Sequence, residues 1–327
     1  MIIYNPHDIH LIKDRSKEVE TMLKQQTTKH CFITGSFIYK NKYNDIDIFF
    51  ITRSKKEIKM SNKKVKKNHK TILFLGKSLF SKDMGSLLSF LNKKVIETKG
   101  FLSIFTPNPE QFVLADNNSQ FSKLLDKGTI LIPDGIGVVM ASKFLGRIYK
   151  KPSIRERITG VDLVQELLKI AGTKKWKVLL LGGKGYGDNI HQIESIGLSR
   201  EKKLSLLWSP GYKDITKPRK AEEEKVKKLI QKEKPDLVFV AFCAPWQEKW
   251  IIEHTALLEK NGSRIAMAVG GTFDMLLGKI QRAPVIIRAI GLEWLFRLFQ
   301  EPWRWRRQLK LVSFVKLVFK EVFAEKK

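Results

Sequence analysis

Short apolar runs alternate with longer amphipathic runs from residue 71 to residue 271. The short runs are typical of buried strands and cover residues 71–76, 100–106, 128–133, 177–183, 235–242 and 264–271. The longer runs repeat apolar residues at helical spacing and cover residues 83–97, 109–125, 135–146, 160–172, 221–234 and 246–262. This alternation predicts an α/β fold with a Rossmann-like, mostly parallel sheet and helices on both faces.

The pattern divides the chain into four parts. Residues 1–52 hold one predicted helix and two apolar runs, which indicate a small N-terminal α/β segment. Residues 53–70 carry nine Lys or Arg against one Glu and show no apolar period, so they predict a basic linker. The α/β core then covers residues 71–278. Residues 279–327, called here the C-terminal appendage, mix Trp, Phe and Leu with Arg and Lys and predict one or two basic amphipathic helices.

The apolar positions of the last predicted helix follow helical spacing. They are Leu309, Val312, Val315, Phe319 and Val322. Such a helix either lies on a membrane surface or packs on the core with a charged outer face. Trp303 and Trp305, which stand among three arginines, favour contact with anionic headgroups.

Composition narrows the class of protein without fixing it. The net charge of +28 and the pI near 10.0 favour anionic partners such as nucleic acid, acidic lipid or phosphorylated substrates. A solvated lysine-rich surface explains the same charge equally well. The two cysteines, Cys31 and Cys243, form no metal or disulfide spacing, which fits a reducing cytoplasm. The N-terminus lacks a signal-peptide pattern, and no uncharged run reaches the roughly 18–20 residues of a spanning helix.

Polar residues and glycines follow the predicted strands. Thr106, Asn108, Asp134 and Gln247 come directly after strands, where parallel sheets bind ligands. The alternative for Thr106, Asn108 and Asp134 is helix N-capping. The glycine turns that end at Gly183 and Gly271 also follow strands, and there the backbone can approach a phosphate or ribose closely.

The order of these motifs is more specific than any one of them. TPNPEQF, PDGIGVV, RITGVDL, LLGG, APWQEKW, VGGTFD and RAPVIIRAIGLEWLFRLFQEPWRW, over roughly residues 71–310, resemble the WecG/TagA/CpsF family, glycosyltransferase family 26. The resemblance implies an inverting transferase that needs no metal or cofactor. It implies transfer of a hexose-type sugar, with N-acetylmannosamine as first choice, from a UDP-sugar to a polyprenyl-diphosphate-linked GlcNAc acceptor. The enzyme would be cytoplasmic and peripheral at the inner membrane face, in teichoic acid or surface polysaccharide synthesis.

The resemblance also assigns roles to single residues. Asp134 matches the family's catalytic base, which would take the proton of the attacking hydroxyl. Thr106 and Asn108 match a polar pair in the same pocket, and Gln247 matches a motif glutamine. Arg157 matches a motif arginine, with Arg155 as the alternative by spacing. The C-terminal arginines that would bind the UDP diphosphate are Arg297, Arg304 and Arg307.

The N-terminal stretch TGSFIYKNKYNDIDIFFI resembles the signature of a minimal nucleotidyltransferase. Gly35 and Ser36 would meet a triphosphate, and Asp45 and Asp47 would hold Mg²⁺. No third carboxylate follows on a strand, so the segment is interpreted as an inactive remnant or a docking module. A solvated loop with two acids is the alternative.

Two other classes of protein compete with the transferase. The charge and the Trp/Arg-rich appendage would suit a nucleic-acid-binding protein, whereas the transferase is expected to bind no nucleic acid. GGKGYG suggests a nicotinamide- or nucleotide-binding oxidoreductase, but no acidic residue follows at the distance that a ribose requires. The sequence does not fix the oligomeric state of the transferase, which is compatible with a homo-oligomer.

Overall fold

The computed structural model describes residues 3–4, 30–34, 47–51, 71–97, 100–183, 185–186 and 204–324. The chain divides into two compact units, Met1–Lys70 and Thr71–Lys327. In the first unit β1 (Ile3–Tyr4) and β3 (Asp47–Ile51) both pair antiparallel with β2 (His30–Thr34). Of the predicted nucleotidyltransferase residues, only the backbone of Asp47 is described. Gly35, Ser36, Asp45 and the basic linker lie outside the described residues.

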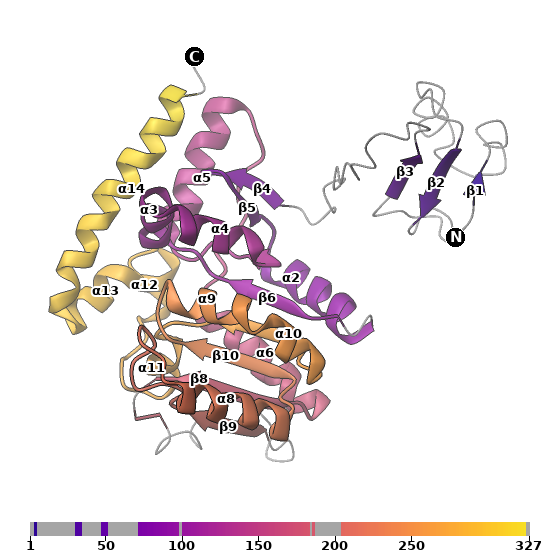
Figure 1. Cartoon of the computed structure of the whole chain (residues 1–327). Helices are drawn as coiled ribbons and strands as arrows, with labels where there is room; N and C mark the ends of the chain where they lie inside the picture. The colour runs from indigo at the N-terminus through magenta and orange to yellow at the C-terminus, as the bar shows by residue number, and fades with distance from the viewer. Residues whose placement is uncertain are drawn as a thin grey trace. The chain divides into compact units, whose positions relative to one another are not determined.

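The second unit is built on an eight-stranded sheet (Figure 1). Its strands in chain order are β4 (Thr71–Phe74), β5 (Lys77–Phe80), β6 (Leu102–Phe105), β7 (Ile130–Leu131), β8 (Lys177–Gly182), β9 (Ser205–Ser209), β10 (Leu237–Ala241) and β11 (Ile265–Ala268). Their order across the sheet is β4-β5-β7-β6-β11-β10-β8-β9. All neighbours are parallel except β4 and β5, so the predicted mostly parallel sheet is confirmed.

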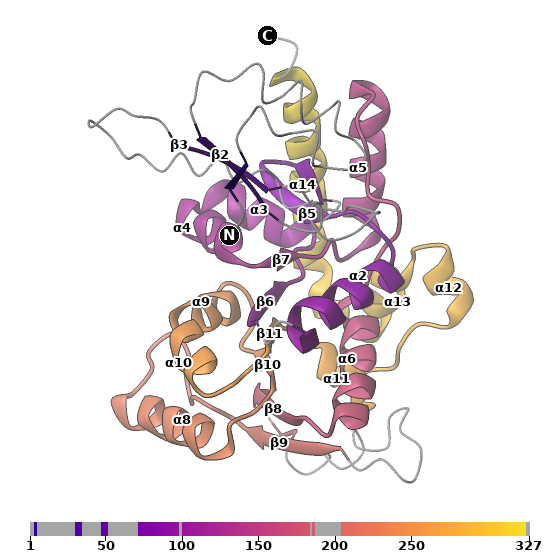
Figure 2. The ribbon, with the colours of Figure 1, turned by 90° about the vertical axis from the view of Figure 1, so that its right-hand side faces the viewer.

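The central strands β6, β11, β10 and β8 are buried along almost their whole length because helices cover both faces of the sheet. Alternate residues of one strand enter opposite cores. Val178 and Leu180 face one core, whereas Leu179 and Leu181 face the other, and all four are fully buried. Figure 2 shows α2 and α6 on one side of the sheet and α8, α9 and α10 on the other. The predicted arrangement of helices on both faces is therefore confirmed.

The helices of the second unit that precede the appendage alternate with the strands along the chain. They are α2 (Met84–Leu91), which continues as a π-helical stretch (Asn92–Glu97), α3 (Pro109–Asn117), α4 (Ser119–Lys127), α5 (Ile136–Tyr149), α6 (Gly160–Lys174), α8 (Lys220–Glu233), α9 (Trp246–Glu253), α10 (Thr255–Lys260) and α11 (Thr272–Leu276). Within the described residues, no helix is long and apolar enough to cross a membrane.

Two predicted helices are each broken in two by a side chain. Asn118 ends α3, and its side chain accepts a hydrogen bond from the Phe121 N–H at 2.9 Å, which starts α4. His254 separates α9 from α10, and its ring stacks on Trp250 with a centroid distance of 4.2 Å. The predicted strand 71–76 is instead the start of a hairpin, because Leu75 and Gly76 both adopt positive φ and turn the chain back.

The C-terminal appendage forms α12 (Val285–Ala289), α13 (Glu293–Gln300), a 3₁₀ turn (Pro302–Arg304) and α14 (Trp305–Ala324). Figure 1 shows α14 running beside α3 and α5. Phe314 enters the core between Phe74 and Phe112, at ring-centroid distances of 6.4 and 6.1 Å. Val318 and Val322 are buried one and two turns further on.

The predicted apolar stripe of α14 is divided between two faces of the helix. Val322 belongs to the buried face, but Leu309, Val312, Val315 and Phe319 are about half exposed. The helix has a second apolar face, formed by Phe314, Val318 and Val322, which packs on the core. The outer apolar face, with lysines beside it, remains open to solvent.

We expect Phe314→Ala to lower the free energy of unfolding by about 3–5 kcal/mol, because it leaves a cavity between α14 and α3. Phe323→Ala is the matched control, since Phe323 lies on the same helix and is 64% exposed. It should change stability by less than about 0.5 kcal/mol. Urea denaturation of both variants measures the difference, and equal effects would show that α14 does not pack as described.

Candidate active site

Asp134 lies at the carboxyl edge of the sheet, three residues after β7. Its backbone N–H donates to the Pro107 carbonyl at 3.1 Å, which joins the ends of β7 and β6. Gly160 shows what surrounds its carboxylate. A Cβ atom on Gly160 would lie 3.8 Å from Asp134 Oδ2, 3.8 Å from Thr106 Oγ1 and 3.6 Å from Thr272 Oγ1. Asp134 and Thr106, which the sequence placed in one pocket, are therefore brought together, and Thr272 joins them from the end of β11.

The environment of Asp134 suits a base at neutral pH. Burial raises the pKa of Asp134 to about 6; the positive charge of Arg157 lowers it, and the negative charge of Glu293 raises it. The backbone N–H groups of Gly135 and Gly160 also favour the charged form and lower the pKa. The carboxyl group is thus mostly ionised at pH 7, yet basic enough to accept a proton.

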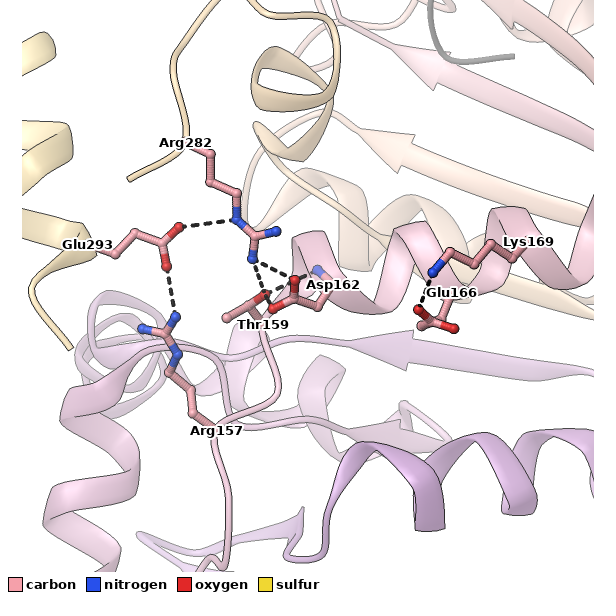
Figure 3. A network of polar contacts seen from close by, with 7 residues as sticks. All are labelled: Arg157, Thr159, Asp162, Glu166, Lys169, Arg282 and Glu293. Atoms are coloured by element: carbon pink, nitrogen blue, oxygen red, sulfur yellow. Dashed lines mark hydrogen bonds and ion pairs between the residues drawn. The ribbon is translucent and has the colours of Figure 1, made fainter. Parts of the chain in front are cut away.

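Arg157, not Arg155, is the arginine beside the carboxylate. Arg155 points to the surface, where its side chain is 76% exposed and lies 3.4 Å from Asp83. The Arg157 Nη2 donates to Glu293 Oε2 at 2.8 Å, and both side chains are 16% exposed. Figure 3 shows that Glu293 also faces Arg282, which belongs to the appendage.

Asn108 is the N-cap of α3, as the alternative of helix N-capping predicted. Its Oδ1 accepts from the Gln111 N–H at 3.0 Å, and Gln111 Oε1 accepts from the Asn108 N–H at 3.2 Å. This capping box fixes the loop that carries Thr106. Asn108 itself is only partly buried.

Gln247 is more deeply placed than a residue that binds sugar directly would be. It is 4% exposed, and its Oε1 accepts from the Gly270 N–H at 3.0 Å. Its Nε2 donates to Glu248 Oε1 at 2.9 Å, and the same oxygen accepts from Gln111 Nε2 at 2.9 Å. A buried hydrogen-bond chain therefore joins the loops after β6, β10 and β11, and Gln247 positions the turn at Gly270.

Both glycine turns are filled by side chains of the protein. Gly183 has a φ of +77°, and a Cβ there would lie 1.9 Å from the Tyr186 ring, so only glycine permits this packing. Tyr186 in turn donates to Asp274 Oδ1 at 2.8 Å. A Cβ at Gly271 would lie 2.9 Å from Asp274 Oδ2 and 3.3 Å from Arg297 Nη2. Gly271 therefore borders a charged region rather than an open phosphate cradle.

The three predicted appendage arginines form one cluster. Arg297 and Arg304 donate to the same Glu301 oxygen, at 2.8 and 2.5 Å. Arg307 donates to Glu110 Oε2 at 2.9 Å, in the first turn of α3. Burial, followed by the positive charge of Arg297, lowers the pKa of Arg304, which shows how closely the guanidinium groups approach.

In this cluster each of the three arginines has a carboxylate as its partner. Burial raises the pKa of Glu301, but hydrogen bonds from Arg297 and Arg304 outweigh it and hold the pKa below its usual range. Arg297 also reaches the turn at Gly271. In the described ranges, no three His, Cys, Asp or Glu side chains are grouped so that they could hold a metal ion.

Glu248, Glu293 and Arg282 are site residues that the sequence did not reveal. Glu248 is fully buried, and burial raises its pKa to about 7. Its Oε2 finds no partner among the described residues. Each of these residues lies in a sequence motif in which a different residue was the predicted site residue. Only the packing of α9 and α13 shows that the side chains of Glu248 and Glu293 turn inward.

The chain is similar to a known family and to characterised transferases. The model of the Glycosyl transferase WecG/TagA/CpsF family matches residues 72–327. An N-acetylglucosaminyldiphosphoundecaprenol N-acetyl-beta-D-mannosaminyltransferase from Bacillus subtilis (strain 168) is 33% identical over 240 residues, which cover 73% of this chain and 87% of that protein. A protein of the same name from Staphylococcus aureus (strain MRSA252) is 33% identical over 227 residues, 69% of this chain and 82% of its own length.

We expect Glu248→Gln to change how stability depends on pH. The folded state raises the carboxyl pKa from 4.5 to about 7, so it holds a proton that the unfolded state releases between these values. Stability of the wild type therefore falls as pH rises through this window, whereas the amide carries no such penalty. Relative to the wild type, Glu248→Gln should gain about 3 kcal/mol between pH 4.5 and 7.5.

Urea denaturation across this pH range measures the gain. The control is Glu253→Gln, at the exposed end of the same helix, which should stay within about 0.5 kcal/mol of the wild type at each pH. A pH-independent difference for Glu248→Gln would contradict the buried acid.

Proposed function

Because the chain belongs to the WecG/TagA/CpsF family of glycosyl transferases, we propose that it transfers N-acetylmannosamine from a UDP-sugar to a polyprenyl-diphosphate-linked GlcNAc acceptor. The acceptor and sugar are those in the names of the matched relatives, of which the chain covers most of the length. The single observation that carries the mechanism is the Asp134 carboxylate, which stands among Thr106, Thr272 and Arg157 at the sheet edge. Neither the site nor the relatives support the nucleic-acid-binding alternative.

Asp134 is the general base of this reaction. The acceptor hydroxyl attacks C1 of the donor sugar, the new C1–O bond forms as the bond to UDP breaks, and Asp134 takes the hydroxyl proton. Attack opposite the leaving group inverts C1. This fits the beta linkage in the relatives' names if the donor is an α-linked UDP-sugar. Thr106 and Thr272 supply hydroxyls that can orient the reacting groups.

The arginine cluster receives the leaving diphosphate. UDP gains negative charge as it departs, and guanidinium groups held by carboxylates can exchange those partners for phosphate oxygens. Arg297, Arg304 and Arg307 can do this without a metal ion. Glu301 and Glu110 keep the cluster organised before the donor binds.

The outer face of the appendage brings the enzyme to its lipid-linked acceptor. Trp303 and Trp305 are 69% and 54% exposed, and the outer residues of α14 form an apolar stripe beside Lys310, Lys316 and Lys320. A basic helix with such a face lies on an anionic bilayer. We place the protein at the inner face of the cell membrane, in teichoic acid or surface polysaccharide synthesis.

We expect Asp134→Asn to lower kcat by about 100- to 10,000-fold without a comparable change in KM for the donor, because the amide cannot accept the proton. UDP release from a panel of UDP-sugars, with a GlcNAc-diphosphoryl-lipid acceptor and EDTA, measures it. Wild-type kcat/KM should fall below about pH 6, as Asp134 becomes protonated. Asp116→Asn, on the surface of α3, is the control. Full activity of Asp134→Asn would exclude this base, and dependence on a divalent metal would exclude the metal-free mechanism.

We expect the triple substitution Val312→Ser, Phe319→Ser and Phe323→Ser to reduce binding to anionic vesicles by at least about tenfold, because it removes apolar area that would enter the headgroup region. Vesicle sedimentation measures binding, and activity on a soluble acceptor should persist. Deleting α14 would be a poorer test, since Phe314 and Val318 are part of the core. Unchanged sedimentation would exclude this face as the membrane contact.

A further inference from the structure

Helix α5 carries exposed apolar side chains beside the outer face of α14. Met140, Phe144 and Ile148 follow one another at intervals of four residues and are 64%, 43% and 40% exposed. The opposite side of the helix, which includes Val138 and Leu145, is buried in the core. The helix is therefore apolar toward the core and again toward solvent, although packing on the core requires only the first of these faces.

Two contacts hold the exposed side of α5 against that of α14. Midway along α5, the rings of Phe144 and Phe319 meet edge to face at a centroid distance of 5.9 Å. At the end of α5, the Tyr149 hydroxyl donates to the Glu321 carbonyl oxygen at 3.0 Å. Figures 1 and 2 both show the two helices side by side. Together they form one surface, called here the two-helix face, which consists of Met140, Phe144, Ile148, Val315, Phe319 and Phe323.

Unpaired cations border the two-helix face. Lys143 and Arg147 are exposed on α5, and Lys316 is exposed on α14. None of these three side chains has an ion pair or a hydrogen bond in the part of the chain that the structure describes. Residues 135–155 and 302–320 hold five and six Lys or Arg, respectively, and no Asp or Glu. The face therefore combines apolar side chains with positive charge that no neighbouring acid in either stretch neutralises.

We propose that α5 is a membrane-contacting helix of the α/β core, and that the two-helix face as a whole lies on an anionic bilayer. Met140 and its apolar neighbours enter the headgroup region, while Lys143, Arg147 and Lys316 extend their long side chains to the lipid phosphates. The proposal rests on the proposed function, because a lipid-linked acceptor is what brings the enzyme to a bilayer. It extends the membrane contact from the appendage to the core.

A second copy of this chain fits the two-helix face less well than a bilayer does. A two-fold dimer through this face would bring Lys143 and Arg147 of each copy toward the cations of the other. No acidic residue in the two stretches pairs with them, and like charges that face each other across an interface are costly. Lipid phosphates supply the missing negative charge and attract each cation that lies near the membrane surface.

Contact through α5 sets the height of the catalytic carboxylate above the bilayer. The helix begins at Ile136, two residues after Asp134, and one of its sides is buried in the core. The exposed residues start at Met140, about 6 Å further along the helix axis. In the proposed acceptor GlcNAc is joined to its lipid only through a diphosphate, so its hydroxyl stays close to the headgroups. A core helix that lies in the headgroup region therefore keeps the base within reach of that hydroxyl.

The first test reverses two charges of α5 in the full chain, with Lys143→Glu and Arg147→Glu combined. The matched control combines Lys225→Glu and Lys228→Glu, which lowers the net charge equally on the exposed side of α8, far from α5 in Figures 1 and 2. Sedimentation with vesicles of phosphatidylglycerol and phosphatidylcholine, at one salt concentration, measures binding. We expect the α5 variant to bind at least about 30-fold more weakly, because two attractive contacts are lost, and the control to change by less than about threefold.

The second test measures contact directly and leaves the charges of α5 in place. Met140→Cys is labelled with the fluorophore NBD in a Cys31→Ser, Cys243→Ser background of the full chain, and Lys228→Cys is the control site. NBD emission rises and shifts to the blue when the fluorophore leaves water. On addition of the same anionic vesicles we expect emission to rise at least about twofold for the label on α5 and to stay unchanged for the label on α8.

Emission from the α5 label that vesicles leave unchanged, or equal vesicle binding by the α5 and α8 charge variants, would overturn the proposal. So would emission that rises with protein concentration in the absence of vesicles, because a second copy would then cover the face. Sugar transfer from UDP donors is measured separately. If the wild type transfers no sugar while the α5 label enters the bilayer, the proposed function fails and the membrane contact stands. If sugar is transferred while the label stays in water, the membrane contact of α5 fails and the proposed function stands.

Discussion

The parallel register of the central strands is the constraint on which the site depends. β7, β6, β11, β10 and β8 run in one direction, so loops far apart in sequence end at one edge of the sheet. Asp134, Thr106 and Thr272 meet around Gly160 only because three of these strands end there. No local sequence motif could bring these three side chains together, since each lies on a separate loop.

Two kinds of polar contact stabilise the loops at the carboxyl edge of the sheet. The first kind is the hydrogen-bond chain from Asn108 through Gln111 and the Glu248 carboxyl group to Gln247, which fixes three loops against one another. The charged kind surrounds it, where arginines of the appendage and of the core pair with carboxylates. Rigid amide contacts suit loops that orient a substrate, whereas ion pairs can exchange partners when a diphosphate arrives.

The sequence predicted the α/β core because the alternation of strands and helices follows from periodicity. Asp134 stood out as a carboxylate after a buried strand, and the structure keeps it there. Arg155 and Arg157 could not be separated, since they share a loop whose direction hydropathy does not encode. Gln247 was assigned to the ligand although it is buried, because burial of α9 depends on tertiary packing.

The division of the predicted α14 stripe between two faces has a similar physical cause. Apolar residues occur on two faces of this helix, so helical spacing alone fits either face, and Val322 fits the predicted stripe while packing with Phe314 in the core. Both faces have partners if the protein acts as proposed: the core on one side and a bilayer on the other. Anything that binds the docked appendage stabilises it by mass action. Adsorption of the outer face would then stabilise the packing of Phe314, Val318 and Val322 on the core.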